Sequence, residues 1–291
     1  MLARLRLEIV RLRLARPVFD CPASGGAAVS LLFALAVAFG TAYGPAVAAQ
    51  GRGGTARAAI PRTSDGKPNL QGIWQVRNTA SVDLLDHLAS HGARAGRSVV
   101  DGGSIPYQPW AAKKKAENYA ARATADPMAN CYLPGVPRIM YLDYPFHIFQ
   151  TRDAVAITFE WSQVFRLIHT NGTKPVDGIE FWMGDSRGRW EGDTLAVTVT
   201  NHNDKTWFDN AGNFHSEQLK VEERYTLEDA DTLRYDVTLE DPKVFTRPWK
   251  MSMPLYRQKG MDRILEYQCQ AEAEEASGAF ERDPRTWFPG R

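Results

Sequence analysis

The spacing of apolar residues divides the chain into a helical part and a strand part. Before Cys131 the helical spacing predicts two short helices, at 80–92 and 109–123. After Cys131 apolar and polar residues alternate with a period of two for most of the chain, which is typical of half-buried strands. The strands expected from these patterns are residues 69–76, 146–150, 154–160, 164–170, 179–183, 194–200, 217–227, 232–240, 249–256 and 263–270.

This succession of short strands predicts a mainly β fold. An antiparallel meander must hide its edges, either by closing into a barrel or by stacking as a β-sandwich. Short connections between neighbouring strands favour a lipocalin-like β-barrel, with the sandwich as the alternative. Gly72-Ile73-Trp74 is similar to the Gly-x-Trp that opens lipocalin strands, and Asn171-Gly172 predicts a hairpin turn because both residues tolerate positive φ.

Composition defines the expected domain boundaries. Residues 1–49 contain arginines, an apolar run and then small residues, which predicts a signal peptide cleaved after Ala48 or Ala49. A retained membrane anchor is the alternative, and no stable membrane span is expected after cleavage. A flexible linker at 50–66, a barrel domain at 67–272 that includes both helices, and a tail at 273–291 follow.

Charge and motifs exclude several classes of partner. The 35 basic and 34 acidic residues give a net charge of +1, so nothing draws the chain toward nucleic acid. No P-loop, dinucleotide fingerprint or nucleophile elbow is present, and no cofactor is expected. His202, Asp204, Asp209 and His215 could ligate a metal, but their spacing matches no metalloenzyme motif, so no metal site is expected.

Two cysteines, Cys131 and Cys269, remain once the signal peptide is removed. An even count in an exported chain predicts a disulfide between them, because disulfides persist outside the cytoplasm. Two buried, unbridged thiols are the alternative. The signal peptide and the cysteines together indicate a periplasmic or secreted bacterial protein.

Candidate chemistry begins with a carboxylate on an apolar strand face. In the strand at 217–227 the alternation places Glu223 with Val221 and Tyr225, and a buried carboxylate must be paired or protonated. Arg166 is a candidate partner, and Glu160 lies within hairpin reach. We expect these groups to serve as proton-transfer or anchoring residues; a purely structural ion pair is the alternative.

The connection at 201–216 is long and rich in aromatic residues, which is typical of loops that contact ligands at a barrel mouth. It carries His215, a candidate general acid or base, for which an ordinary exposed histidine is the alternative. Aromatic residues of the strand-rich half are expected to line an apolar pocket. The expected ligand-binding residues are Trp182, Trp190, Trp207, Phe208, Tyr225, Trp249 and His169.

Several segments together resemble a large group of exported bacterial proteins that have no established activity. The resemblance rests on "PRTSDGKPNLQGIWQ", "PYQPWAA", "CYLPGVPR", "MGDSRGRWEGDTLAVTVTNHNDKTWFDNAGNFHSEQLKVEERY", "LEDPKVFTRPWKMSMPLY" and "LEYQC". It implies export and no mechanism. From the residues we expect a barrel that binds a small apolar or aromatic molecule; the alternatives are a cofactor-independent lyase, isomerase or hydrolase on the same barrel, and a structural module with a filled interior.

Overall fold

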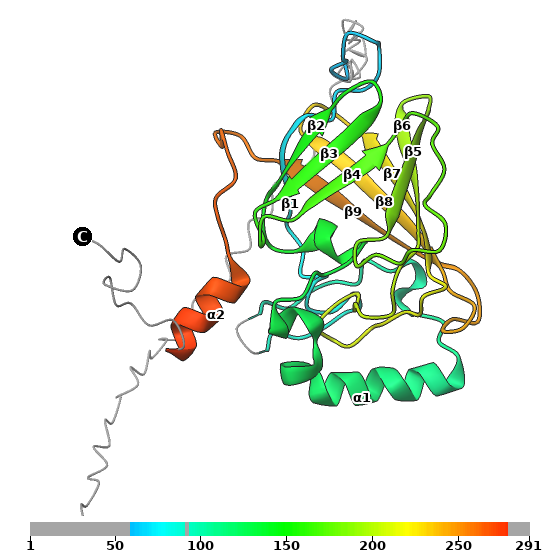
Figure 1. The fold of residues 1–291 in the computed structure, drawn as a ribbon, viewed down its shortest axis with the longest axis vertical. Helices are drawn as coiled ribbons and strands as arrows, with labels where there is room; N and C mark the ends of the chain where they lie inside the picture. Colours follow the sequence, from blue (N-terminus) through cyan, green and yellow to red (C-terminus); the bar gives the residue numbers. More distant parts are fainter. Residues whose placement is uncertain (1–58, 91–92, 279–291) are drawn as a thin grey trace, which may run out of the picture. The chain divides into compact units, whose positions relative to one another are not determined.

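The computed structural model of the protein describes residues 59–90 and 93–278. Within these ranges the strands form one closed β-barrel, in which each strand pairs with the next and β1 closes against β9 (Figure 1). The predicted barrel is therefore confirmed, and the sandwich is not formed. The strands are β1 Gly72–Val76, β2 Phe146–Gln150, β3 Ala154–Phe159, β4 Phe165–His169, β5 Asp185–Glu191, β6 Thr194–Thr200, β7 Lys220–Leu227, β8 Thr232–Glu240 and β9 Trp249–Arg257.

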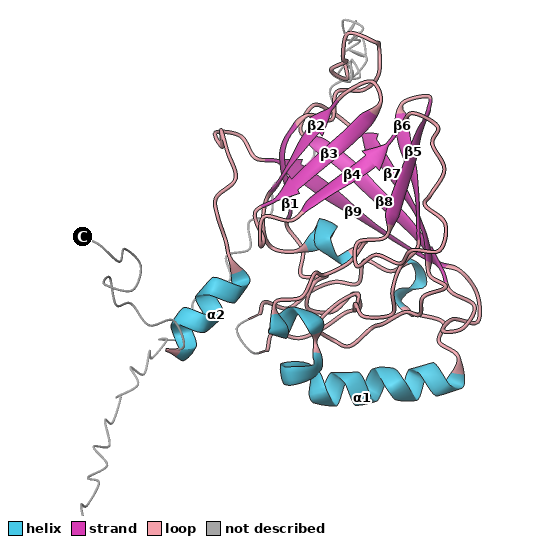
Figure 2. Cartoon of the chain, in the orientation of Figure 1, coloured by secondary structure: helices cyan, strands magenta, loops and turns pink. Residues whose placement is uncertain are grey.

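One pairing departs from the expected antiparallel meander. β4 and β5 run parallel, through Ile168 with Ser186 and His169 with Arg187, because residues 170–184 carry the chain back to the end of the barrel where β4 begins. Asn171-Gly172 consequently opens this crossing connection (Figure 2) and does not form the predicted hairpin.

The strand expected at 179–183 is also wrong. Ile179 and Phe181 are exposed, and the pairing partner of β6 is β5, which starts at Asp185. The polar sequence of β5 conceals its strand character, since an edge formed mostly of charged and glycine residues shows no apolar alternation. The turn at Gly192-Asp193 then joins β5 to β6 as a tight hairpin.

The helix predicted around 109–123 is confirmed as α1, Pro109–Ala125, with Pro109 in the first turn. The helix predicted at 80–92 is wrong. Side-chain carboxylates capture its backbone donors, since Asp83 accepts from the Leu85 amide and Asp209 accepts from the Leu84 amide. The remaining helical segments are η1 Asp101–Gly103, η2 Pro127–Asn130, η3 Arg138–Tyr141 and α2 Cys269–Ser277.

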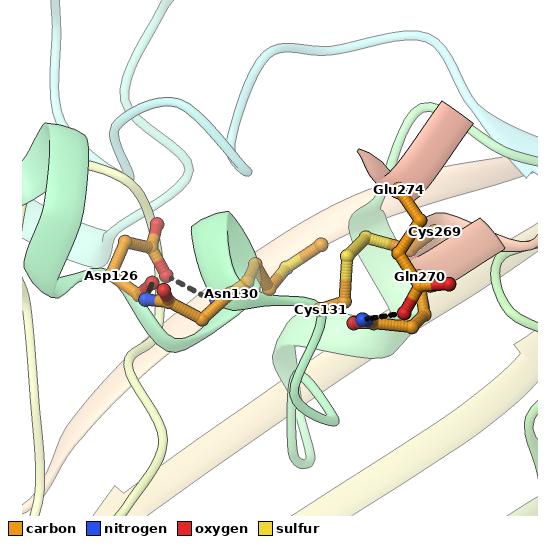
Figure 3. The surroundings of a disulfide bond; sticks show 7 residues. Asp126, Asn130, Cys131, Cys269, Gln270 and Glu274 are labelled. Carbon is orange, nitrogen blue, oxygen red and sulfur yellow. Dashed lines mark hydrogen bonds between the residues drawn. A yellow bond between two sulfur atoms is a disulfide. The ribbon is translucent and has the colours of Figure 1, made fainter. Parts of the chain in front are cut away.

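A disulfide joins Cys131 to Cys269, as predicted (Figure 3). The element around Cys269 differs from the expectation, because residues 263–270 are not a strand and α2 begins at Cys269. Cys131 ends η2 with a left-handed backbone. The bond therefore holds α2 against the segment that follows α1, across a sequence separation of 138 residues.

The core fills the barrel with inward-facing side chains from alternating strand positions. In β8 these are Leu233, Tyr235, Val237 and Leu239, all buried, while the residues between them are more exposed. Comparable alternation in β3 and β9 completes one continuous apolar cluster. Among the described residues no helix is both long and apolar enough to cross a membrane.

The predicted signal peptide lies outside the described residues. The described end of the predicted linker, residues 59–66, is tied to the barrel through Arg62, whose guanidinium donates to both carboxylate oxygens of Asp193 at 2.9 and 2.8 Å. This pair connects the segment before β1 to the β5–β6 hairpin.

Candidate functional site

Arg166 and Glu223 form a buried ion pair inside the barrel. Arg166 points inward from β4 and Glu223 points inward from β7, and their exposed fractions are 3% and 0%. Nη1 of Arg166 donates to Oε1 of Glu223 at 3.0 Å, Nη2 donates to Oε2, and Nε donates to Ser186 Oγ at 3.1 Å. This two-pronged geometry is the strong form of an arginine–carboxylate contact and fixes both side chains.

Tyr225 and Tyr235 complete the surroundings of Glu223. Their hydroxyls donate to Oε1 at 3.0 and 2.5 Å, and their rings face each other on β7 and β8. Burial and the charge of Glu223 raise the pKa of both hydroxyls well above the usual value, so both remain protonated donors. Burial lowers the pKa of Arg166, but the Glu223 carboxylate more than offsets this and holds it above its usual value.

The 201–216 loop lies between the barrel and α1, and its residues are largely buried (Figure 1). Its backbone and side chains are anchored by segments from elsewhere in the chain. The anchors are Tyr141 to Phe208, Asn118 to Gly212, Leu84 to Asp209, Asn210 to Asp126 and Tyr107 to Asn213. The loop is therefore a packed plug and not an exposed lid.

His215 is buried within this plug, which overturns the alternative of an exposed histidine. Its Nδ1 lies 2.9 Å from the carbonyl oxygen of Ser216, and because a carbonyl only accepts, Nδ1 carries the proton. Burial lowers the pKa of the ring, so Nε2 is unprotonated and accepts from the Thr206 hydroxyl at 2.7 Å. Asp241 holds Ser216 through both its amide and its hydroxyl.

Two further buried rings lack hydrogen-bond partners. Neither ring nitrogen of His202 and not the Nε1 of Trp249 has a partner among the described residues, although both side chains are at most 3% exposed. Burial, then the neighbouring His215 and Arg166, lower the pKa of His202 to about 3, so the ring is neutral at ordinary pH. Orphaned buried donors and acceptors are costly, and such groups indicate a binding site or a bound water.

Ring contacts connect these orphaned groups to the plug. His202 faces His215 with ring centroids 5.7 Å apart, His215 lies 5.2 Å from Phe208, and Phe208 lies 5.9 Å from Trp249. We name His202, Thr206, Phe208, His215 and Trp249 the ring cluster. His215 and Ser216 also line a surface hollow of about 430 Å³ beside α1, so the cluster adjoins solvent-accessible space.

The structure brings together some of the predicted site residues. Arg166, Glu223 and Tyr225 form one hydrogen-bonded group, and Phe208, His215 and Trp249 belong to the ring cluster. The positive charge of Arg166 acts on the ring of His202, which links the two groups electrostatically.

The other predicted residues lie elsewhere. Glu160 accepts from the Leu265 amide near the end of β3 and does not reach Arg166. Trp182 stacks on Tyr132 outside the barrel, and His169 shares the outward face of β4 with the exposed Phe165. Trp190 and Trp207 are half-buried and take no part in the ring contacts given above.

Sequence reasoning missed several members of the site. Tyr235 lies on the inward face of its strand, and the alternation around it could have identified this residue. Ser186 could not be found, because the strand that carries it was read as a turn. Thr206 and the unpartnered state of His202 depend on the packing of the loop, which leaves no sequence signal. No group of three or more metal-ligating side chains is assembled within the described ranges.

Comparisons of the chain with protein-family models, with curated proteins and with solved structures find no match. The site geometry therefore carries the functional argument.

Proposed function

We propose that this protein is an exported bacterial protein that binds a small, largely apolar or aromatic molecule at the ring-cluster end of its barrel. The observation that carries the proposal is the set of three buried ring nitrogens without partners, two on His202 and one on Trp249. A ligand that supplied their hydrogen bonds would remove a penalty of about 1–3 kcal/mol for each group.

The cluster determines what such a ligand must present. The indole N–H of Trp249 only donates, and the neutral ring of His202 offers one donor and one acceptor. A carbonyl or hydroxyl oxygen on the ligand matches both. Phe208 and Phe245, which pack on the ring of Trp249, supply apolar walls for the remainder of the molecule. The compensated charges of Arg166 and Glu223 favour a neutral ligand over an ion.

Export rests on the N-terminal pattern and on the cysteines. The Cys131–Cys269 disulfide suits an oxidising compartment, and residues 1–49 have the composition of a signal peptide. Protein recovered from its native host should begin near Ala49 or Gln50. N-terminal sequencing that finds the apolar run retained would replace this assignment with a membrane-anchored one.

Ligand extraction tests the binding function. Protein purified from the periplasm should release a small molecule on denaturation, identified by mass spectrometry, and native mass spectrometry should show the corresponding complex. The variant Trp249→Phe removes one orphaned donor and should bind the extracted compound at least tenfold more weakly. Trp190→Phe, a tryptophan outside the cluster, is the matched control and should retain binding. Recovery of no compound, or equal losses in both variants, contradicts the proposal.

An enzyme on the same barrel is the second candidate, and the Thr206–His215 hydrogen bond favours it. A neutral histidine that accepts from a hydroxyl can serve as a general base. Glu223 is less suited to proton transfer, because Arg166 and two tyrosines already occupy its oxygens. A turnover screen of hydrolase, lyase and isomerase substrates should then lose its signal in Thr206→Val but not in Thr194→Val, a threonine on β6.

A further inference from the structure

Three arginines surround a second hollow, remote in sequence from the ring cluster. The hollow has a volume of about 340 Å³ and lies between residues 77–79, which leave β1, and residues 94–99. Its floor comes from β9 at Ser252–Pro254. This gap exists because β1 ends its pairing with β9 at Val76, after which the Ser252 amide donates to the Val99 carbonyl instead.

Gly96 brings the two rims of this hollow close together. A Cβ at this position would lie 2.0 Å from Thr79 Oγ1 and 2.3 Å from His87 Cε1, so only glycine permits the approach. Thr79 Oγ1 lies 3.0 Å from Nε2 of His87, whose Nδ1 contacts the Leu85 carbonyl. The rims are therefore built, and not merely two loops that pass each other.

The arginines are Arg77, Arg94 and Arg97, and none has an ion-pair partner among the described residues. Arg77 is steadied from below, since its Cζ lies 4.6 Å from the ring centroid of Tyr256. Three positive charges at one hollow repel each other, and an anion placed between them relieves that repulsion. Their planar guanidinium groups suit carboxylate and phosphate oxygens.

Acidic side chains near the hollow do not neutralise these arginines. No aspartate or glutamate is among the described residues that line it. Asp86 and Asp236 hydrogen-bond to lining residues, but Asp86 accepts from the Ser98 amide, and Asp236 accepts from the Ser252 hydroxyl and pairs with Arg234. The Asn78 amide and the hydroxyls of Thr79 and Ser98 add uncharged polar groups to the lining.

From this arrangement we infer that the arginine hollow is an anion-binding site for a small molecule that bears a carboxylate or phosphate group. The volume is at the lower end of small-molecule pockets, which suits a compact polyanion better than a long chain. The site is distinct from the ring cluster, so it stands or fails independently of the proposed function.

Calorimetric titration of the full chain tests this site with three probes: citrate, pyrophosphate and a neutral sugar such as glucose. We expect citrate or pyrophosphate to bind at low ionic strength, with affinity that falls in physiological salt, and glucose not to bind. Binding of citrate alone identifies carboxylates as the ligand class, and binding of pyrophosphate alone identifies phosphates.

Paired variants separate the site from general surface charge. The double variant Arg94→Gln/Arg97→Gln should bind the anion at least tenfold more weakly with an unchanged melting temperature, since both side chains are exposed. Arg152→Gln/Arg247→Gln removes the same charge from exposed arginines outside the hollow and should bind like the wild type. Absence of anion binding, or equal weakening in the two double variants, overturns the proposal.

Discussion

Arg166 and Glu223 stand 57 residues apart in the sequence and meet as a bidentate, fully desolvated ion pair inside the barrel. Their strands are separated by β5 and β6, so the pair spans the interior. Removing one partner from such a pair leaves an uncompensated buried charge, whereas replacing both with apolar residues is far less costly. This asymmetry makes the role of the pair measurable.

Glu223→Gln should destabilise the protein by about 3–5 kcal/mol, because Arg166 keeps its charge and loses its counter-ion. The double variant Arg166→Met/Glu223→Leu should recover a large part of that loss. Equilibrium denaturation in urea gives both values. A Glu223→Gln variant within about 1 kcal/mol of the wild type would mean that water or a ligand compensates Arg166, contrary to this expectation.

This pair also illustrates what sequence can and cannot specify. Period-two alternation placed Glu223 on the inward face of its strand and suggested Arg166 as its partner, because a strand's face follows directly from residue parity. The parallel pairing of β4 with β5 and the backbone capture that replaces the helix at 80–92 depend on long-range contacts, which no local pattern records. The unpartnered nitrogens of His202 have the same origin.

His202 should make stability depend on pH. Its folded-state pKa of about 3 lies below the usual 6.5, so the contribution of this group is complete above pH 6.5 and is lost as the pH falls toward 3. Between pH 6.5 and 5 the wild type should lose roughly 2 kcal/mol relative to His202→Gln, which cannot titrate. Denaturation curves of both proteins across this range provide the difference. Parallel pH profiles would show that the ring already binds a proton in the folded state.

Asp209 acts in the opposite direction, which is why the variant comparison is needed. Burial and then the charge of Asp83 raise its pKa to about 7, so the folded state holds a proton that the unfolded state releases above about pH 4. Its contribution to stability therefore declines as the pH rises from about 4 to 7. The wild-type profile alone combines both effects, and the difference from His202→Gln isolates one of them.

The disulfide should contribute measurably to stability. Closing a loop with a sequence separation of 138 residues restricts the unfolded chain, which the chain-entropy model values at about 5 kcal/mol. Cys131→Ser/Cys269→Ser should lower the free energy of unfolding by up to that amount. Intact mass after alkylation, with and without reduction, checks the bond itself: two alkylated thiols in unreduced folded protein would show that it is absent.

Gly212 marks the contact between the plug and α1, and its replacement should distinguish packing from backbone strain. Its φ is +82°, and a Cβ would lie 2.7 Å from Asn118 Cβ and 2.8 Å from the Tyr119 amide nitrogen of α1. Gly172 has a similar φ of +77° with open space around it, so Gly172→Ala carries only the strain, about 1 kcal/mol. Gly212→Ala should cost about 1–3 kcal/mol more, because α1 must shift. Thermal and urea denaturation measure both variants. Equal costs would mean that α1 rests loosely on the loop and that the ring cluster is not sealed from this side.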